Sequence, residues 1–405
     1  TRQARHVAQH RDAVPEPFAG TVSLTAHQRA ADYTLAKGRF GLVTLAFGVV
    51  VLLGWTLMGG LDALNQAMRE LIAPRFGNIA YQLALLGAFA VIGSLLDLPF
   101  EWYSRFGIEQ RFGFNRMGWK LYVADTLKGV VVGVIVGLPI AALMLWIMGA
   151  TGGLWWLWAW GVWMVFNLLM LVLYPTLIAP LFNKFEPLSD ESLVRRVQAL
   201  MTRCGFAAKG LFVMDGSKRS AHGNAYFTGF GAAKRVVFFD TLLSKLSPGE
   251  VEAVLAHELG HFKHRHIVKR IVAMFALSLA GFALLGWLSS RSWFYVGLGV
   301  SPNLAAPNDA LALLLFMLAV PVFGYFVSPL FAQLSRRHEF EADAYACAQA
   351  SSADLASALL KLHEDNASTL TPDPVYVKFY YSHPPASERL AALPGFSAST
   401  RPAIP

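Results

Sequence analysis

The residues His257-Glu258-Leu259-Gly260-His261 form the most informative stretch of this chain. Histidines four residues apart lie on one face of a helix, about one turn from each other, so both imidazoles can bind one Zn²⁺. The glutamate between them can take a proton from the water that attacks a substrate. The pattern indicates a zinc hydrolase, although it also occurs by chance on helices whose histidines are only hydrogen-bonded.

The residues before the motif predict that it lies on a helix. Ser247 is typical of an N-cap, Pro248 of the first helical position, and Glu250 of a capping box. Apolar residues then follow at helical spacing, namely Val251, Val254, Leu255 and Leu259.

A zinc hydrolase needs a third protein ligand and one position left for water. Glu339 and Asp343 are four residues apart on a second predicted helix, so Glu339 can bind the metal while Asp343 hydrogen-bonds a ligand histidine. Glu341 is expected to point elsewhere, and His338 is a weaker candidate ligand. The alternative for this segment is a solvated, charged helix end.

The composition excludes an ordinary soluble domain. Mean hydropathy is +0.45 over 405 residues, and only 15% of them are charged. Six apolar segments are long enough to span a bilayer: 41–60, 79–100, 127–149, 154–182, 268–290 and 310–333. Pro139 and Pro321 are expected to kink two of these helices. His264 and His266 are interpreted as basic residues at the interface, not as ligands.

Lysine and arginine are concentrated before the first span and between the second and third. By the positive-inside rule, both termini and the zinc motifs are expected on the cytoplasmic side. The net charge of +8 fits attraction to anionic lipid headgroups, and no pattern of a nucleic-acid partner is present. Cys204 and Cys347 are interpreted as buried thiols in a reducing cytoplasm.

The sequence predicts five segments. Residues 1–38 form a polar, flexible arm, 39–183 contain four spans, and 184–267 form a protease subdomain with the zinc helix. Residues 268–334 contain two further spans, and 335–405 form a cytoplasmic subdomain with the third ligand. A helix is expected at 191–203 and strands at 211–214 and 235–239. A strand within 220–229 is expected to act as an edge that pairs with an extended peptide.

Several ordered blocks resemble one family, the zinc-dependent CAAX prenyl endopeptidases of the intramembrane, a-factor-converting type. The similarity runs from about Ala31 to Leu393. Its blocks include Leu98-Pro99-Phe100, Phe112-Gly113-Phe114-Asn115, Pro180 to Phe185, Asp215 to Ser220, Asn224 to Gly229, Ala256 to His261, Glu339 to Tyr345, Ser382 to Pro385 and Glu388 to Leu390.

The resemblance implies a mainly α, polytopic membrane protein. About six transmembrane helices would surround a chamber, with a cytoplasmic α+β zinc protease domain of the gluzincin type. It implies one Zn²⁺ held by His257, His261 and Glu339, with Glu258 as catalytic base and Asp343 behind a ligand histidine. Three further residues would hold the substrate backbone or stabilise an oxyanion: Asn224, His383 and Arg389. From the residues alone, Asn224 is interpreted as a turn residue. His383 is then equally typical of a turn before Pro384-Pro385, and Arg389 of a salt-bridged helix residue.

The implied reaction is cleavage of carboxyl-terminal tripeptides from prenylated proteins. The chain departs from the eukaryotic members of this family in two ways. It has six predicted spans where they have seven, and Arg401–Pro405 is no dilysine-type retrieval signal. Both differences favour a prokaryotic member in a cytoplasmic membrane. The substrate is then a peptide or protein with or without a prenyl group. A quality-control protease for unprenylated membrane proteins is the alternative, and a transporter or channel with structural zinc is a third hypothesis. The oligomeric state is left open.

Overall fold

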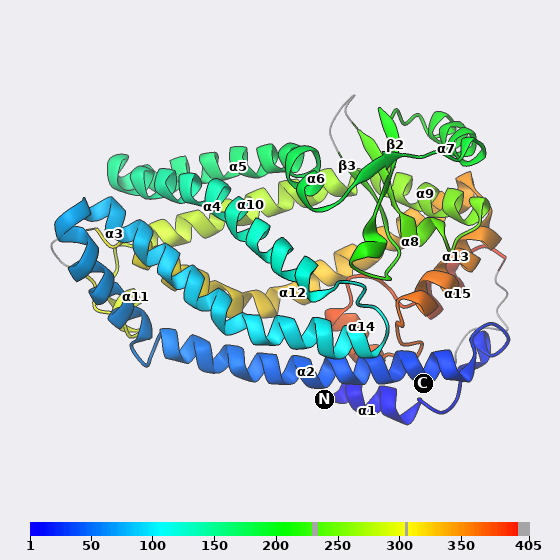
Figure 1. Cartoon of the computed structure of the whole chain (residues 1–405), viewed down its shortest axis with the longest axis horizontal. Helices are drawn as coiled ribbons and strands as arrows, with labels where there is room; N and C mark the ends of the chain where they lie inside the picture. The colour runs from blue at the N-terminus through cyan, green and yellow to red at the C-terminus, as the bar shows by residue number, and fades with distance from the viewer. Residues whose placement is uncertain (229–233, 304–306, 396–405) are drawn as a thin grey trace.

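The computed structural model describes residues 1–228, 234–303 and 307–395 (Figure 1). Gly229 and Arg401–Pro405, which belong to motifs considered above, lie outside these residues. Long helices extend along the longest axis of the molecule, and a small sheet with its surrounding helices lies at one end, on the right of Figure 1. The protein is therefore mainly helical with a mixed α/β part at one end, as the sequence predicts.

Six helices in the described parts of the chain are long and apolar enough to cross a membrane, which confirms the predicted number. They are α2 (Leu24–Trp55), α3 (Gly60–Trp102), α4 (Trp119–Ala150), α5 (Trp155–Leu173), α10 (His266–Leu288) and α12 (Asp309–Gln349). Helical turns η2 (Tyr103–Glu109) and η4 (Tyr174–Ile178) extend α3 and α5, and η3 (Gly152–Leu154) precedes α5. Pro139 and Pro321 lie inside α4 and α12. Many large apolar side chains on these helices are exposed, as is expected of surfaces that face lipid.

Helix α3 is longer than the predicted span 79–100. It begins at Gly60, and its backbone leaves the helical conformation at Gly77, where φ is 82°. Glycine adopts this positive φ without the steric cost that a Cβ would add. The predicted span thus matches only the part of α3 that follows this break.

The expectation of a flexible N-terminal arm is wrong. Residues Arg2–Gln9 form helix α1, in which Val7 is fully buried, and α2 already begins at Leu24. The arm is held by Asp373, whose carboxylate accepts a hydrogen bond from Arg2 Nε at 2.7 Å and whose backbone N–H donates to Gln3 Oε1 at 2.7 Å. These partners are about 370 residues apart in sequence, so a local pattern of polar residues does not reveal them.

In sequence, the strands of the sheet lie between the fourth span and the zinc helix. Its strands are β1 (Phe185–Pro187), β2 (Gly210–Met214), β3 (Ala225–Thr228) and β4 (Arg235–Phe239), in the order β1-β2-β4-β3. Strands β2 and β4 are parallel, and the other two pairs are antiparallel. The strands predicted at 211–214 and 235–239 are confirmed. Among the described residues β3 is an edge strand of this sheet.

Shorter helices complete the fold. They are α6 (Ala179–Phe182), α7 (Glu191–Arg203), α8 (Asp240–Leu243), α9 (Pro248–Lys263), α11 (Ser292–Val296), α13 (Ser352–Asp365), α14 (Pro374–Tyr380) and α15 (Ala386–Ala392), with 3₁₀ turns η1 (Glu16–Phe18) and η5 (Gly216–Lys218). The helix predicted at 191–203 is α7. Cys204 and Cys347 are free and half-buried.

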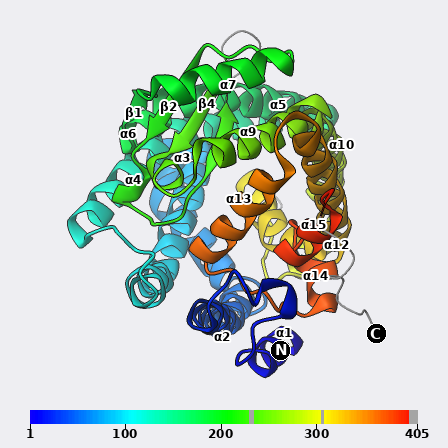
Figure 2. The same ribbon diagram turned by 90° about the vertical axis from the view of Figure 1, so that its right-hand side faces the viewer.

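Helix α9 carries the sequence motif and is held on several sides. Ser247 and Glu250 form the predicted capping box at its start. Val251, Leu255 and Leu259 are buried in a core shared with α7, α13 and the sheet. In Figure 2, α9 lies between α7 on one side and α13 on the other. The motif is therefore presented by a helix with little freedom to move.

Glu250→Ala is expected to lower the free energy of unfolding by about 1–3 kcal/mol, the usual cost of leaving buried polar partners unpaired. The Glu250 carboxylate accepts from Ser357 Oγ at 2.6 Å, Lys361 Nζ at 2.8 Å and the Ser247 backbone N–H at 2.7 Å. Burial opposes its charge, but these donors prevail and lower the pKa of Glu250 from 4.5 to about 2.

The sign of the pH dependence follows from this lowered pKa. Because the folded protein favours ionised Glu250, this stabilisation is present above pH 4.5 and is lost as the pH falls towards 2. Thermal unfolding of wild type and Glu250→Ala across this range measures the difference. The two curves should converge in acid, and a difference that stays constant with pH would contradict the assignment.

Candidate metal centre

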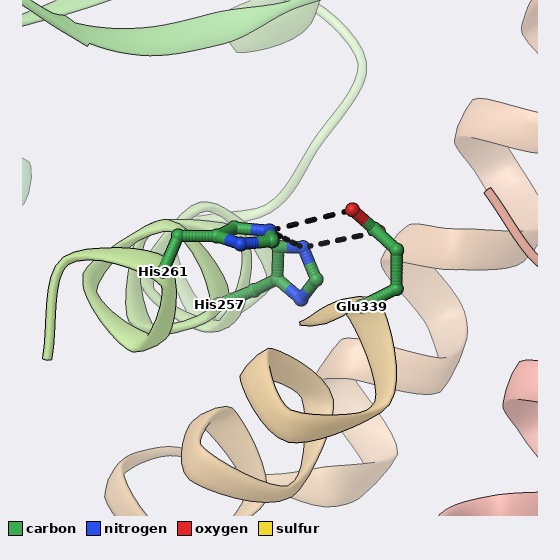
Figure 3. Close-up of side chains that lie close together, drawn as sticks. All are labelled: His257, His261 and Glu339. Atoms are coloured by element: carbon green, nitrogen blue, oxygen red, sulfur yellow. Dashed lines mark hydrogen bonds and ion pairs between the residues drawn. The ribbon is translucent and has the colours of Figure 1, made fainter. Parts of the chain in front are cut away.

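Helices α9 and α12 bring His257, His261 and Glu339 together (Figure 3). One ligand atom from each lies within 4.8 Å of the others. The two Nε2 atoms are 3.2 Å apart, and Glu339 carboxylate oxygens lie 3.5 Å from His257 Nε2 and 3.4 Å from His261 Nε2. His257 and Glu339 are buried, and His261 is half-buried.

Gly260 allows the two helices to approach this closely. A Cβ added at Gly260 would lie 2.9 Å from Ala342 Cα and 3.0 Å from its carbonyl oxygen, in the backbone of α12. Such distances are shorter than ordinary packing contacts, so any side chain at this position would push α12 away. The glycine inside the motif is therefore what lets Glu339 reach the two histidines.

The outer side of the His257 ring is held by charged groups. Its Nδ1 lies 2.8 Å from Asp343 Oδ1, one turn beyond Glu339 on α12. Arg389, on α15, donates from Nε to Asp343 Oδ2 at 2.8 Å and from a terminal nitrogen to Asp343 Oδ1 at 2.6 Å. Another terminal nitrogen of Arg389 lies 3.5 Å from Glu339. Burial opposes ionisation of Arg389, but Asp343 outweighs this effect and raises the pKa of its guanidinium.

The outer side of the His261 ring is also occupied, and the partner was not expected. His261 Nδ1 lies 2.9 Å from His266 Nδ1, and His266 Nε2 lies 2.9 Å from Glu341 Oε2. The interpretation of His266 as an interfacial basic residue is therefore wrong, since its side chain is only 4% exposed. His264, in contrast, is exposed. Glu341 does point away from the ligand atoms, but it is linked to one of the ligands.

The donor set suits a metal such as Zn²⁺. Because both ligand histidines have their Nδ1 atoms engaged on the outer side, their Nε2 atoms are directed at the shared point. Two imidazole nitrogens and one carboxylate form the three-ligand pattern of catalytic zinc sites, in which a further position stays free.

A pocket of about 610 Å³ opens onto these ligand atoms. It is lined by Glu258, and partial burial there raises the pKa of the Glu258 carboxyl. His383 lies on the same wall, with its Nε2 3.4 Å from Glu339 and its side chain 67% exposed. Arg389 and Asn224 also line the pocket, and Asn224 Oδ1 accepts a hydrogen bond from the Ala225 N–H at 2.8 Å.

Much of the remaining pocket wall is apolar, and two membrane spans supply a large part of it, although Asn167 and Arg270 of these spans also line the pocket. Side chains of α5 and α10 contribute Leu168, Leu171, Ile267, Ile271, Met274 and Phe275. The pocket thus joins a set of metal donors, a carboxylate next to them, and an apolar surface that continues into the membrane-spanning region. This combination defines the class of membrane-embedded metallopeptidases.

Comparison with known proteins agrees with this class. Residues 3–184 match the family described as CAAX prenyl protease N-terminal, five membrane helices, and residues 187–396 match peptidase family M48. The chain is 34% identical over 393 residues to a CAAX prenyl protease 1 homolog of Arabidopsis thaliana, which covers 96% of this chain and 92% of the relative. It is 33% identical over 390 residues to CAAX prenyl protease 1 of Saccharomyces cerevisiae, covering 90% and 85%.

A solved structure is similar over almost the whole chain. The crystal structure of S. mikatae Ste24p superposes with a TM-score of 0.89 at 31% identity, covering 97% of this chain and 95% of that one. The chain therefore belongs to peptidase family M48 and is a multi-pass membrane metalloendopeptidase. Within residues 3–184 it has four candidate spans, α2 to α5 with their extensions, where the family description gives five membrane helices.

Proposed function

We propose that the chain is a zinc endopeptidase that removes carboxyl-terminal tripeptides from prenylated proteins with CAAX ends. The observation that carries the proposal is the shared pocket, in which His257, His261, Glu339 and Glu258 face an apolar wall. The names of the relatives point to the same substrate class. An apolar wall beside the metal donors suits a substrate that carries a lipid next to the bond to be cut.

The proposed chemistry assigns one role to each residue. A zinc ion held by His257, His261 and Glu339 would supply a Lewis acid, which polarises a peptide carbonyl and acidifies water. Glu258 takes the proton of the attacking water and passes it to the leaving amine, and its raised pKa suits a group that must both accept and release a proton. Asp343 holds His257 in the orientation in which Nε2 faces the metal.

Two further roles concern the substrate. Strand β3 offers an edge at which an extended peptide can pair, and Asn224 lies directly before it, at the pocket. His383, exposed towards the pocket, is assigned to the oxyanion. Arg389 is already bonded to Asp343, so we assign it to orientation of the ligands and to long-range stabilisation of negative charge.

We also infer the sidedness of the molecule. The lysine and arginine distribution favours a cytoplasmic location for the metal end. The contacts of Arg2 and Gln3 with Asp373 support a common side for the N-terminal arm and the segment before His383. We propose the cytoplasmic membrane of a prokaryote as the location. The division into segments, with helix α1 and the start of α2 in place of a flexible arm, and the chamber that the family resemblance implies are part of the same proposal.

A second candidate function is quality control of unprenylated membrane proteins. The observation that favours it is that β3 has no strand partner on its outer side among the residues that the structure describes. Pairing of backbone N–H and C=O groups at such an edge depends on no particular side chain and needs no lipid. This function shares the zinc site and the base with the first proposal, and only the substrate differs.

His383→Ala is expected to reduce kcat by about 10²–10³, the usual cost of removing one donor to a developing oxyanion. The zinc content should remain unchanged, because His383 is not among the proposed ligands. Steady-state kinetics with a peptide substrate, together with metal analysis, measure both quantities. A rise in KM at constant kcat would instead make His383 a residue of ground-state binding.

A paired cleavage assay in liposomes tests the substrate. It uses one CAAX-ended peptide with and without its farnesyl group, against wild type and Glu258→Gln. Cleavage of the farnesylated peptide alone, absent in the variant, supports the prenyl protease. Equal cleavage of both peptides supports the quality-control function, and absence of Glu258-dependent cleavage rejects both substrate assignments.

A further inference from the structure

We propose that His266 and Glu341 position the ligand His261, as Asp343 positions His257. The two residues form a hydrogen-bonded chain from Glu341 through His266 to His261, here called the Glu341–His266 relay. The inference rests on the proposed zinc site and adds two residues to its function that the sequence patterns did not identify.

The protonation of the relay follows from its end points. The lone pair of His261 Nε2 must face the metal, so the ring proton of neutral His261 lies on Nδ1. That N–H donates to His266 Nδ1, 2.9 Å away, which must then be an acceptor. The proton of His266 therefore lies on Nε2 and donates to Glu341 Oε2, also at 2.9 Å. Every donor in the chain meets an acceptor.

The His266 ring is fixed in its plane as well as at its two nitrogens. His338 of α12 stacks on it with ring centroids 3.9 Å apart and an interplanar angle of 10°. His264 stacks on it at 5.5 Å and 15°. The ring is buried, so water cannot easily take its place in the hydrogen bonds to His261 and Glu341. A bridging imidazole held in this way also prevents the His261 ring from turning over and presenting Nδ1 to the metal.

Helix α12 thus supplies three carboxylates to one centre, each in a different position. Glu339 faces the two histidines with which it would hold the metal, and Asp343, one turn later, reaches the His257 ring directly. Glu341 is two residues from Glu339 and so about 200° around the helix, on another face. The imidazole of His266, at the start of α10, spans the distance that Glu341 alone does not cover. The other Glu341 oxygen accepts from Arg337 Nε at 3.1 Å.

The test uses the full chain in detergent and compares the affinity for zinc, measured by competition with a chelator. His266→Phe keeps a ring of similar size but removes both nitrogens, and Glu341→Ala removes the terminal acceptor. Both variants should bind zinc about 10–100-fold more weakly, the usual effect of losing an outer partner of a ligand histidine. Glu341→Gln keeps an acceptor oxygen and should restore most of the affinity. Lys269→Gln, an exposed change on α10, the helix of His266, should leave the zinc affinity unaltered.

A purely structural role is distinguished by the melting temperature of the zinc-free proteins. Positioning predicts that zinc-free variants melt like zinc-free wild type, and that kcat at saturating zinc falls more than KM rises. Wild-type zinc affinity in both His266→Phe and Glu341→Ala overturns the inference. If His266→Phe does not fold, Glu341→Ala decides, because its side chain is 30% exposed and leaves the ring in place. Wild type that binds no zinc would reject the proposed function itself.

Discussion

Glu258→Gln is expected to reduce peptide hydrolysis by at least about 10²–10⁴, the usual contribution of a general base. The substitution keeps the shape of the side chain but removes its ability to accept a proton. The three proposed ligands are untouched, so zinc content and melting temperature should match those of wild type. Peptide cleavage rates and metal analysis of the same preparation measure both.

Glu252→Gln is a matched control for this variant. Glu252 lies on the same helix α9 but does not line the pocket. It faces α7 instead and forms ion pairs there with Arg196 and Arg203. It should lose stability and retain its rate per folded molecule. If Glu258→Gln hydrolyses peptides as fast as Glu252→Gln, another group must be the base.

Glu339→Ala is expected to release the metal and with it all hydrolysis. The variant removes one of the three proposed ligands. The loss of zinc affinity should therefore exceed about 10–100-fold, the loss typical of removing an outer partner of a ligand. It also removes the carboxylate that lies 3.4 Å from His383 Nε2, whereas Arg389 keeps its hydrogen bonds to Asp343. Metal analysis after dialysis against a weak chelator provides the measurement. Full zinc occupancy in Glu339→Ala would show that the third ligand has been assigned incorrectly.

The parts of the molecule that could be predicted from sequence are those specified by neighbouring residues. The capping box of Ser247 and Glu250 and the four-residue spacing of His257 and His261 define the helix and its face without knowledge of the rest. Hydropathy likewise identifies six spans, because a bilayer requires long apolar runs whatever the fold. The placement of Glu339 and Asp343 on one helix face is also a local property; Glu339 lies near both histidines, and Asp343 reaches His257.

The parts that could not be predicted depend on distant contacts. The sequence around His266 suggests a position at the membrane interface, because nothing near it in sequence reveals Glu341, which is 75 residues away. The helical period correctly predicts that Glu341 lies on a different face from Glu339. It does not predict that the side chain of His266 connects Glu341 to His261. The N-terminal arm is ordered by Asp373 for the same reason.

Helix α12 extends over 41 residues, about 60 Å at 1.5 Å per residue, roughly twice the thickness of the hydrocarbon core of a bilayer. Its apolar part lies in the span, and its last turns carry Glu339, Glu341 and Asp343. A bilayer that is too thin or too thick is accommodated by helix tilt, and a tilt of this helix would displace all three carboxylates relative to α9. Hydrolysis in liposomes should therefore pass through a maximum as the lipid acyl chains are lengthened, so that lipid composition acts as a determinant of turnover.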